Sequence, residues 1–260
     1  MRARINTLAH VAAFMTVLGG LGWLLMRGSD SLNYPWHWER IPDFIYTWDE
    51  QGFTPGPLLE GLWVTIKISA VSLLLAFVFG LVTALLRLSD SFVGRFLARV
   101  YLETIRNTPL LTQILVMYFL FAPLLGLDAV TSGVLALSLF EGAYGSEIIR
   151  AGIVSIDKGQ WEAAHSLGLS TSQTYRKIVL PQALRRVLPP LASLAVTLVK
   201  DSALVSAIAV AELSKQGAII VARYWLTFET WFTVAALYLC LTIPLSLLAL
   251  MLERRIKVRS

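Results

Sequence analysis

Charged residues, cysteine and histidine are all scarce in this chain of 260 residues. Only 15% of the residues are charged, whereas 56% are hydrophobic, and long stretches such as 107–127 carry no charge at all. These stretches reach the roughly 20 residues that cross a bilayer as a helix, so an ordinary soluble domain is excluded. The single cysteine, Cys240, excludes a disulfide within the chain.

The sequence also lacks the signatures of several enzyme classes. It has no His-Glu-x-x-His, no Gly-x-Ser-x-Gly and no phosphate-binding glycine loop followed by Lys-Ser or Lys-Thr. Its three histidines, His10, His37 and His165, fall in segments that do not easily converge. A zinc protease, an acyl hydrolase and an ATPase within this chain are therefore unsupported, although a membrane-embedded enzyme or a passive scaffold remains the alternative class.

The apolar stretches predict an all-α integral membrane protein. They show no alternation of polar and apolar residues, which a membrane β-barrel would require. Two further stretches are apolar apart from Glu141 and Glu147 in one and Lys200 and Asp201 in the other. The six expected spans are 8–26, 58–86, 107–126, 129–149, 188–210 and 229–252.

The basic residues orient these spans. With a cytoplasmic N-terminus, 16 basic residues fall in inside segments and only Arg27, Arg40, Lys215 and Arg223 fall outside. Both termini are then cytoplasmic, and the net charge of +5 indicates attraction to an anionic inner leaflet rather than to nucleic acid. The first span is read as a retained anchor, because it is longer than a signal-peptide core and no cleavage site follows it.

Residues 150–187 form the longest inside connection and predict two helices joined at a glycine. The first helix is expected at 158–167, and Gly168 stands where a helix ends in a left-handed residue. Ser170 with Gln173 matches a capping box for the second helix. That helix is expected to end at Pro181, before Pro189-Pro190 opens the next span. A rigid projecting handle is the functional interpretation, and an idle amphipathic hairpin on the membrane is the structural one.

Four motifs stand out between Gly61 and the C-terminus: Arg-Asn-Thr-Pro-Leu-Leu at 106–111, Tyr-Gly-Ser-Glu-Ile-Ile-Arg at 144–150, Gln-Trp-Glu-Ala-Ala at 160–164 and Val-Lys-Asp-Ser at 199–202. Together they resemble the permease subunits of bacterial ABC importers for polar amino acids, the histidine/glutamine/glutamate permease family. It implies a type I importer (MetI-like) core of five helices plus one extra N-terminal transmembrane helix. The domains are then 1–57, an anchor with a periplasmic segment, and 58–260, the transmembrane domain with its coupling loop at 150–187.

The resemblance also implies the partners and the coupling residues. A dimer of ATP-binding subunits would hydrolyse ATP, and ATP and Mg would bind there, so this chain has no cofactor of its own. A second permease subunit and a periplasmic amino-acid-binding protein complete the complex in the bacterial inner membrane, surrounded by lipid. The cargo is a polar amino acid, or alternatively another small polar solute such as an amino-acid derivative or an opine. The residues expected to couple to the ATPase are Glu162, Ala163, Ala164, Gly168, Ile178, Leu180 and Pro181.

Charges at membrane depth are candidates for a functional site, because an unpaired charge in hydrocarbon costs several kcal/mol. Glu141, Lys200 and Asp201 are expected to border the substrate pathway, with Glu141 and Lys200 either pairing structurally or facing a zwitterionic ligand. Glu147 with Arg150 is expected to form a helix-end pair instead. The predicted pathway further includes Ser202, Asn107, Thr108 and Gln113.

Three segments outside the spans carry weaker signals. The aromatic residues of 27–57 favour anchoring at the headgroup level, with docking of an extracytoplasmic partner as the alternative. Residues 88–106 predict an amphipathic helix at the inner interface, and 211–228 predict a short surface helix.

Overall fold

The computed structural model describes residues 34–49 and 52–257, with a few residues between 15 and 28. The expected first span, 8–26, lies largely outside the described residues. The chain divides into two compact units, Met1–Glu39 and Arg40–Ser260. Apart from the short turn at Trp38–Arg40, which starts in the first unit, every element discussed below lies in the second. The predicted boundary after residue 57 stays a prediction.

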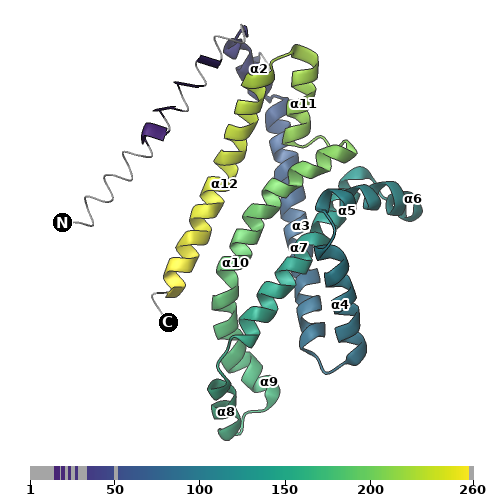
Figure 1. Ribbon diagram of the computed structural model, residues 1–260, viewed down its shortest axis with the longest axis vertical. Coiled ribbons are helices and arrows are strands. Elements are labelled where there is room, and N and C mark those ends of the chain that lie inside the picture. The colour runs from purple at the N-terminus through teal and green to yellow at the C-terminus, as the bar shows by residue number, and fades with distance from the viewer. Residues whose placement is uncertain are drawn as a thin grey trace, which may run out of the picture. The chain divides into compact units, whose positions relative to one another are not determined.

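The second unit is built almost entirely of helices (Figure 1). Its α-helices are α2 (Ile41–Ile45), α3 (Pro57–Leu88), α4 (Phe92–Arg106), α5 (Leu110–Val116), α6 (Ala122–Leu125), α7 (Ala129–Val154), α8 (Lys158–Ser166), α9 (Thr171–Thr174), α10 (Leu180–Asp201), α11 (Leu213–Tyr224) and α12 (Thr227–Lys257). The shorter elements are the 3₁₀ turns η1 (Trp38–Arg40) and η4 (Ser202–Ile208), the π turns η2 (Met117–Phe121) and η3 (Tyr175–Val179), and the strands β1 (Tyr46–Asp49) and β2 (Gly52–Pro55).

Three helical segments of the described part are long and apolar enough to cross a membrane: Pro57–Leu88, Thr171–Ile208 and Thr227–Arg254. A fourth candidate is the pair Phe92–Arg106 and Leu110–Leu125, which is bent by 106°. The helix at the fourth expected span, α7, does not reach the same hydropathy. An all-α membrane fold is therefore confirmed, whereas the count of six spans stays a prediction.

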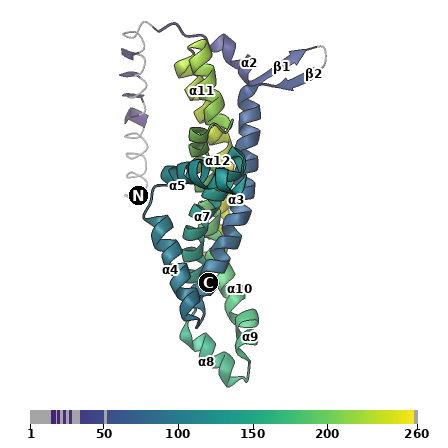
Figure 2. The same ribbon diagram turned by 90° about the vertical axis from the view of Figure 1, so that its right-hand side faces the viewer.

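Helices α3 and α7 pack against each other along much of their length, and small residues make the close approach possible (Figures 1 and 2). A Cβ placed on Gly80 would lie 3.1 Å from the carbonyl oxygen of Gly142, and one on Gly142 would lie 2.9 Å from the Cβ of Phe79. Such small-residue contacts are typical of helices that associate in a bilayer.

Helix α4 packs lengthwise beside α3 and α7, which differs from the interfacial position expected for 88–106 (Figures 1 and 2). Its buried residues are Gly94, Ala98 and Leu102, which recur every four residues and form one face. The Tyr101 hydroxyl donates to the Leu139 carbonyl of α7 at 2.5 Å. The large apolar residues of α4, among them Phe92 and Phe96, are exposed, so the helix packs into the bundle through its small residues.

Two ends of the bundle are named here for later use. The loop end carries α8 and α9, and the hairpin end carries α2, α11 and the β1–β2 hairpin (Figure 2). At the loop end a core cluster joins α3, α7 and α10 through Ala84, Ile149, Ile153, Val179 and Val187 among others. Asp128 caps the N-terminus of α7, where its side chain accepts from the Thr131 N–H. Hydrogen bonds from Thr131 hold the pKa of Asp128 below its usual range.

The second helix of the loop does not end at Pro181, and this expectation was wrong. A continuous helical segment runs from Thr171 to Ile208. The π turn η3 precedes Pro181, and its wider hydrogen-bonding pattern accommodates a residue without an N–H. Pro189 and Pro190 lie inside α10. Because proline has no N–H, the backbone carbonyls one turn earlier receive no helical hydrogen bond. The residues that carry these carbonyls are exposed, so the helix continues without burying an unpaired carbonyl.

Candidate functional site

The connection between α8 and α9, called the elbow, turns at Gly168 as the sequence predicts. Gly168 has a φ of +73°, its N–H donates to the His165 carbonyl (2.9 Å), and the Leu169 N–H donates to the Ala164 carbonyl (3.1 Å). This pair of bonds forms a Schellman motif. The predicted capping box then starts α9: Gln173 N–H donates to Ser170 Oγ and Ser170 N–H donates to Gln173 Oε1. Both corners of the elbow are thus held by local bonds.

Longer-range contacts attach the elbow to the bundle. The rings of Trp161 and Tyr175 meet edge to face with centroids 5.0 Å apart, and both pack against the loop-end core cluster. Arg186 of α10 donates to the carbonyl and the hydroxyl of Ser155, at the C-terminal end of α7 (2.5 and 2.9 Å). A cation in this position is favourable because helix C-termini carry partial negative charge. The elbow is therefore packed against the loop-end cluster through Trp161 and Tyr175, and Arg186 joins α10 to the end of α7 beside it.

The residues expected to couple to an ATPase divide by exposure. Glu162, Ala163 and Gly168 are exposed at the elbow, whereas Ala164 is buried and holds α8 in place. The remaining expected residues lie further along the continuous helix: Ile178 is half-buried, and Leu180 and Pro181 are exposed. The exposed tip carries one carboxylate beside two small residues, which leaves its backbone open to a close partner.

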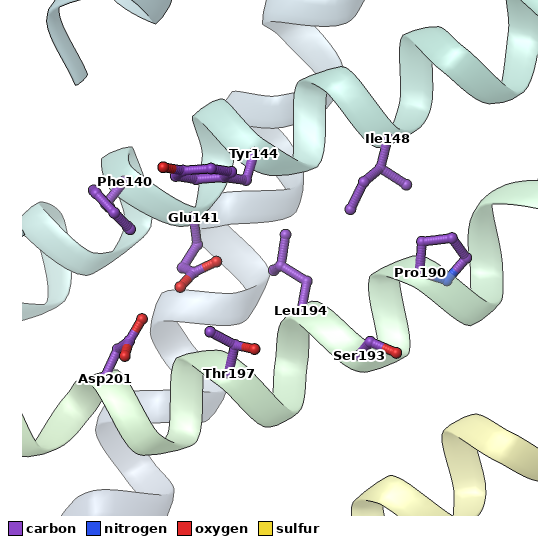
Figure 3. A pocket seen from close by; sticks show the side chains of 9 residues that line it. All are labelled: Phe140, Glu141, Tyr144, Ile148, Pro190, Ser193, Leu194, Thr197 and Asp201. Atoms are coloured by element: carbon purple, nitrogen blue, oxygen red, sulfur yellow. The ribbon is translucent and has the colours of Figure 1, made fainter. Parts of the chain in front are cut away.

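A cavity of about 430 Å³ lies between α7 and α10. Its lining residues are Phe140, Glu141, Tyr144, Ile148, Pro190, Ser193, Leu194, Thr197 and Asp201. Figure 3 shows the carboxylates of Glu141 and Asp201 turned toward each other across this space, with Thr197 beside them. Glu141 is buried, and its Oε1 has no hydrogen-bond partner among the described residues. The cavity lining is thus apolar apart from two carboxylates and the three hydroxyls of Tyr144, Ser193 and Thr197.

Lys200, the expected partner of Glu141, is exposed and does not line this cavity. Among the described residues it takes part in none of the ion pairs within 4.0 Å. The structure therefore brings Glu141 to Asp201 and leaves Lys200 beside them on α10. Sequence spacing gave the depth of these residues but not the rotation of α10 about its axis, which decides which side chain faces Glu141.

The other expected pathway residues lie in two places. Ser202 is buried beside Asp201 and donates to the Val199 carbonyl (2.7 Å). Gln113 sits at the bend between α4 and α5, where its Nε2 donates to the Ile105 carbonyl (2.7 Å) and to Thr108 Oγ1 (2.8 Å). Asn107 binds Glu103 within the last turn of α4. Thr108 and Gln113 line a second cavity of about 280 Å³, and Asn107 stabilises the helix end.

Glu147 binds Arg150 as expected, at 3.2 Å, but it also contacts two arginines that the sequence did not assign to it. Arg87 at the end of α3 donates to Glu147, and Arg106 at the end of α4 lies 3.8 Å away. One carboxylate of α7 thus joins the C-terminal ends of α3 and α4. The sequence does show an arginine near the C-terminal end of each of these helices, but only the packing of the helices shows that the arginines meet at Glu147.

Comparisons with known proteins agree with this geometry. Residues 76–258 match the family described as binding-protein-dependent transport system inner membrane component. The chain is 39% identical to the glutamine transport system permease protein GlnP of Escherichia coli over 204 residues, which cover 77% of this chain and 93% of that one. It is also 39% identical to the L-cystine transport system permease protein TcyB of Bacillus subtilis over 213 residues, covering 80% and 91%.

Solved structures show the same fold. A crystal structure of an amino acid ABC transporter with histidines contains a chain with 37% identity and a TM-score of 0.72, covering 76% of this chain and 94% of that one. An inward-facing structure of the MetNI methionine ABC transporter gives a TM-score of 0.67 at 21% identity, over 77% and 96%, and supports the fold alone. This chain therefore belongs to the family of inner membrane components of binding-protein-dependent transport systems, and its fold is that of a type I ABC importer permease.

Proposed function

We propose that this chain moves an amino acid across the bacterial inner membrane as the permease subunit of an ATP-driven importer. The observation that carries the proposal is the elbow, an exposed, locally capped corner fixed to the two helices that line the cavity. The similarity of the chain to glutamine and cystine permeases supports the same proposal. Both termini are cytoplasmic in this proposal, which rests on the distribution of basic residues.

The elbow is suited to transmit force from a separate ATPase dimer, where ATP and Mg bind. Gly168 and Ala163 leave room for a partner surface, and Glu162 supplies one charge for orientation. Because Arg186 and the Trp161–Tyr175 contact fix the elbow to α10 and α7, a displacement of the tip moves the walls of the cavity. Alternating access follows from that rigid-body movement.

The cavity between α7 and α10 is the proposed part of the substrate pathway in this subunit. Two carboxylates in an apolar wall attract a cationic group, and every amino acid carries an ammonium group. Glu141, Asp201 and the neighbouring Lys200 then border the route taken by the ligand. An amino-acid derivative or an opine remains the alternative cargo, because it presents the same charged groups.

The partners follow from the same mechanism. A periplasmic amino-acid-binding protein delivers the cargo to the hairpin end, and a second permease subunit, identical or homologous, forms the other half of the pathway. The loop end faces the ATPase in the cytoplasm. This arrangement is supported by the family match, whose description names dependence on a binding protein.

Uptake of a labelled amino acid in a strain that lacks this gene tests the function. The intact chain should restore uptake, and Gly168→Pro should not, because proline cannot adopt a φ of +73° and loses the N–H bond to His165. Restoration of uptake by Gly168→Pro at normal expression would contradict the role of the elbow. Competition by unlabelled amino acids, derivatives and opines identifies the cargo class.

A second experiment tests the cavity separately from the elbow. Glu141→Gln should reduce uptake while leaving complex assembly and basal ATPase activity intact, because the amide keeps the volume and removes the charge. Glu60→Gln, at an exposed position of α3, is the matched control. Unchanged uptake by Glu141→Gln would show that this carboxylate does not belong to the substrate pathway, and it would leave the proposed role of the elbow unaffected.

A further inference from the structure

The β1–β2 hairpin has two chemically different faces. Its strands are antiparallel, with Tyr46 opposite Pro55, Trp48 opposite Phe53 and Thr47 opposite Thr54. Opposed residues point to the same side of a two-stranded ribbon and successive residues point to opposite sides. One face therefore carries Tyr46, Trp48, Phe53 and Pro55, and the other carries Thr47, Asp49 and Thr54.

The aromatic face remains open although its rings touch one another. The Phe53 ring lies 6.0 Å from Tyr46 and 6.4 Å from Trp48, measured between centroids. Trp48 is nevertheless 76% exposed, and Phe53 is 55% exposed. A two-stranded hairpin without a packed hydrophobic face is marginally stable in water, and contiguous exposed apolar surface marks an interaction site.

The hairpin is fixed to the bundle at its base, so its direction is defined. The Gly56 N–H donates to the Ile45 carbonyl (2.7 Å), and a Cβ on Gly56 would lie 2.6 Å from the backbone of Phe44. The Phe44 ring packs on Tyr224 of α11 with centroids 4.9 Å apart. Figure 2 shows the hairpin projecting sideways from the end of α3. It thus leaves the bundle across the helix axis, at the point where a candidate span begins.

We propose that the aromatic face of the hairpin binds the headgroup layer of the membrane beside α3. Tyrosine and tryptophan concentrate at this layer because their rings are apolar and their N–H or O–H groups need water-accessible partners. The apolar surface continues down α3, where Trp63 and Leu74 are exposed and Lys67 lies 5.1 Å from the Trp63 ring. The polar face, with Asp49 and two threonines, then faces water.

A soluble protein partner is the competing occupant of the same face. The proposal commits to lipid because the hairpin emerges where the candidate span Pro57–Leu88 begins and because that span itself carries exposed apolar side chains. The chemistry required is that of a phospholipid headgroup region without a specific anionic partner, since the aromatic face carries no charged side chain among its four residues. This binding is independent of the transport reaction.

Site-specific fluorescence in a reconstituted complex tests the proposal. In a Cys240→Ser background, single cysteines Trp48→Cys and Phe53→Cys report the aromatic face, and Thr47→Cys and Thr54→Cys are matched controls on the opposite face. Each is labelled with an environment-sensitive dye in phosphatidylcholine–phosphatidylglycerol vesicles, without any binding protein. A lipid carrying a nitroxide near the carbonyl should quench positions 48 and 53 about twofold or more over positions 47 and 54.

Equal, water-like emission at all four positions would overturn the proposal. So would a pattern in which positions 48 and 53 change only when the binding protein is added, since that result assigns the face to protein docking. Amino-acid uptake is measured on the same variants, so that loss of transport is distinguished from loss of lipid contact.

Discussion

Glycine has different roles in the elbow and on the side of α7 that packs against α10. Gly168 of the elbow needs its missing side chain for backbone conformation, and a Cβ there would meet nothing within 4 Å. Gly152 of α7 has ordinary helical backbone, but a Cβ there would lie 2.1 Å from Val187 of α10. The first glycine permits a turn, and the second permits two helices to approach.

Because of this difference, we expect the elbow to affect coupling to the ATPase and the contacts of α7 to affect the stability of the fold. Bonds within the elbow join residues at most five positions apart, so altering them changes the shape of the tip and leaves the bundle intact. Contacts on α7 join residues more than thirty positions apart and hold the bundle together. Variants of the elbow should therefore lose coupling with little change in stability, and variants of α7 should lose stability first.

Gly152→Ala should have the largest effect on stability. The added methyl group forces α7 and α10 apart at the loop end, and overpacking of this kind costs about 3 kcal/mol. Gly145→Ala on the same helix is the matched control, because nothing lies within 4 Å of its Cβ. Thermal unfolding in detergent measures both. Equal unfolding temperatures would show that the α7–α10 contact is looser than the structure indicates.

Glu147→Gln should have the second-largest effect on stability, because it removes the negative charge that joins the C-terminal ends of α3 and α4 to α7. The loss of charge-assisted bonds to Arg87 and Arg150 costs about 2 kcal/mol, reduced by the partial exposure of the site. Raising the salt concentration should lower the stability of the natural chain toward that of the variant. A salt-independent difference would contradict an electrostatic origin.

Gly168→Ala should cost about 1.5 kcal/mol, because alanine is strained at a φ of +73°. Its effect on transport should exceed its effect on unfolding, and this reverses the order expected for Gly152→Ala. Gly168→Asn is the control, since asparagine tolerates this conformation. Uptake per folded complex is the measurement, and equal losses for alanine and asparagine would rule out backbone strain as the cause.

Ser170→Ala should have the smallest effect, about 1 kcal/mol on the start of α9 and a modest loss of uptake. Ser172→Ala, two residues later and without a capping role, should behave like the natural chain. Hydrogen exchange of the α9 amides compares the two. Protection that falls equally in both variants would show that the capping box does not order the elbow.

The elbow could be predicted from the sequence because its signals are local. Gly168, Ser170 and Gln173 each act on backbone groups within five residues, and all three occupy their predicted positions. The prolines failed as helix terminators because a π turn and an open helix face accommodate them, and neither is visible in the sequence.

The cavity could be predicted only in part. The sequence indicates that Glu141 and Asp201 both lie within apolar stretches, but their mutual approach depends on how α7 and α10 rotate and cross. For the same reason, the contacts of Glu147 with Arg87 and Arg106 could not be predicted, since these residues are separated from Glu147 by 60 and 41 positions. Long-range pairing follows from packing, which one sequence does not specify residue by residue.

A photo-crosslinking amino acid at Glu162 tests the central claim most directly, with the same group at the exposed Leu124 of α6 as the control. In intact cells, position 162 should capture a separate protein that contains a phosphate-binding glycine loop, and position 124 should not. Adducts from position 162 that contain only lipid, at every stage of the transport cycle, would contradict the account.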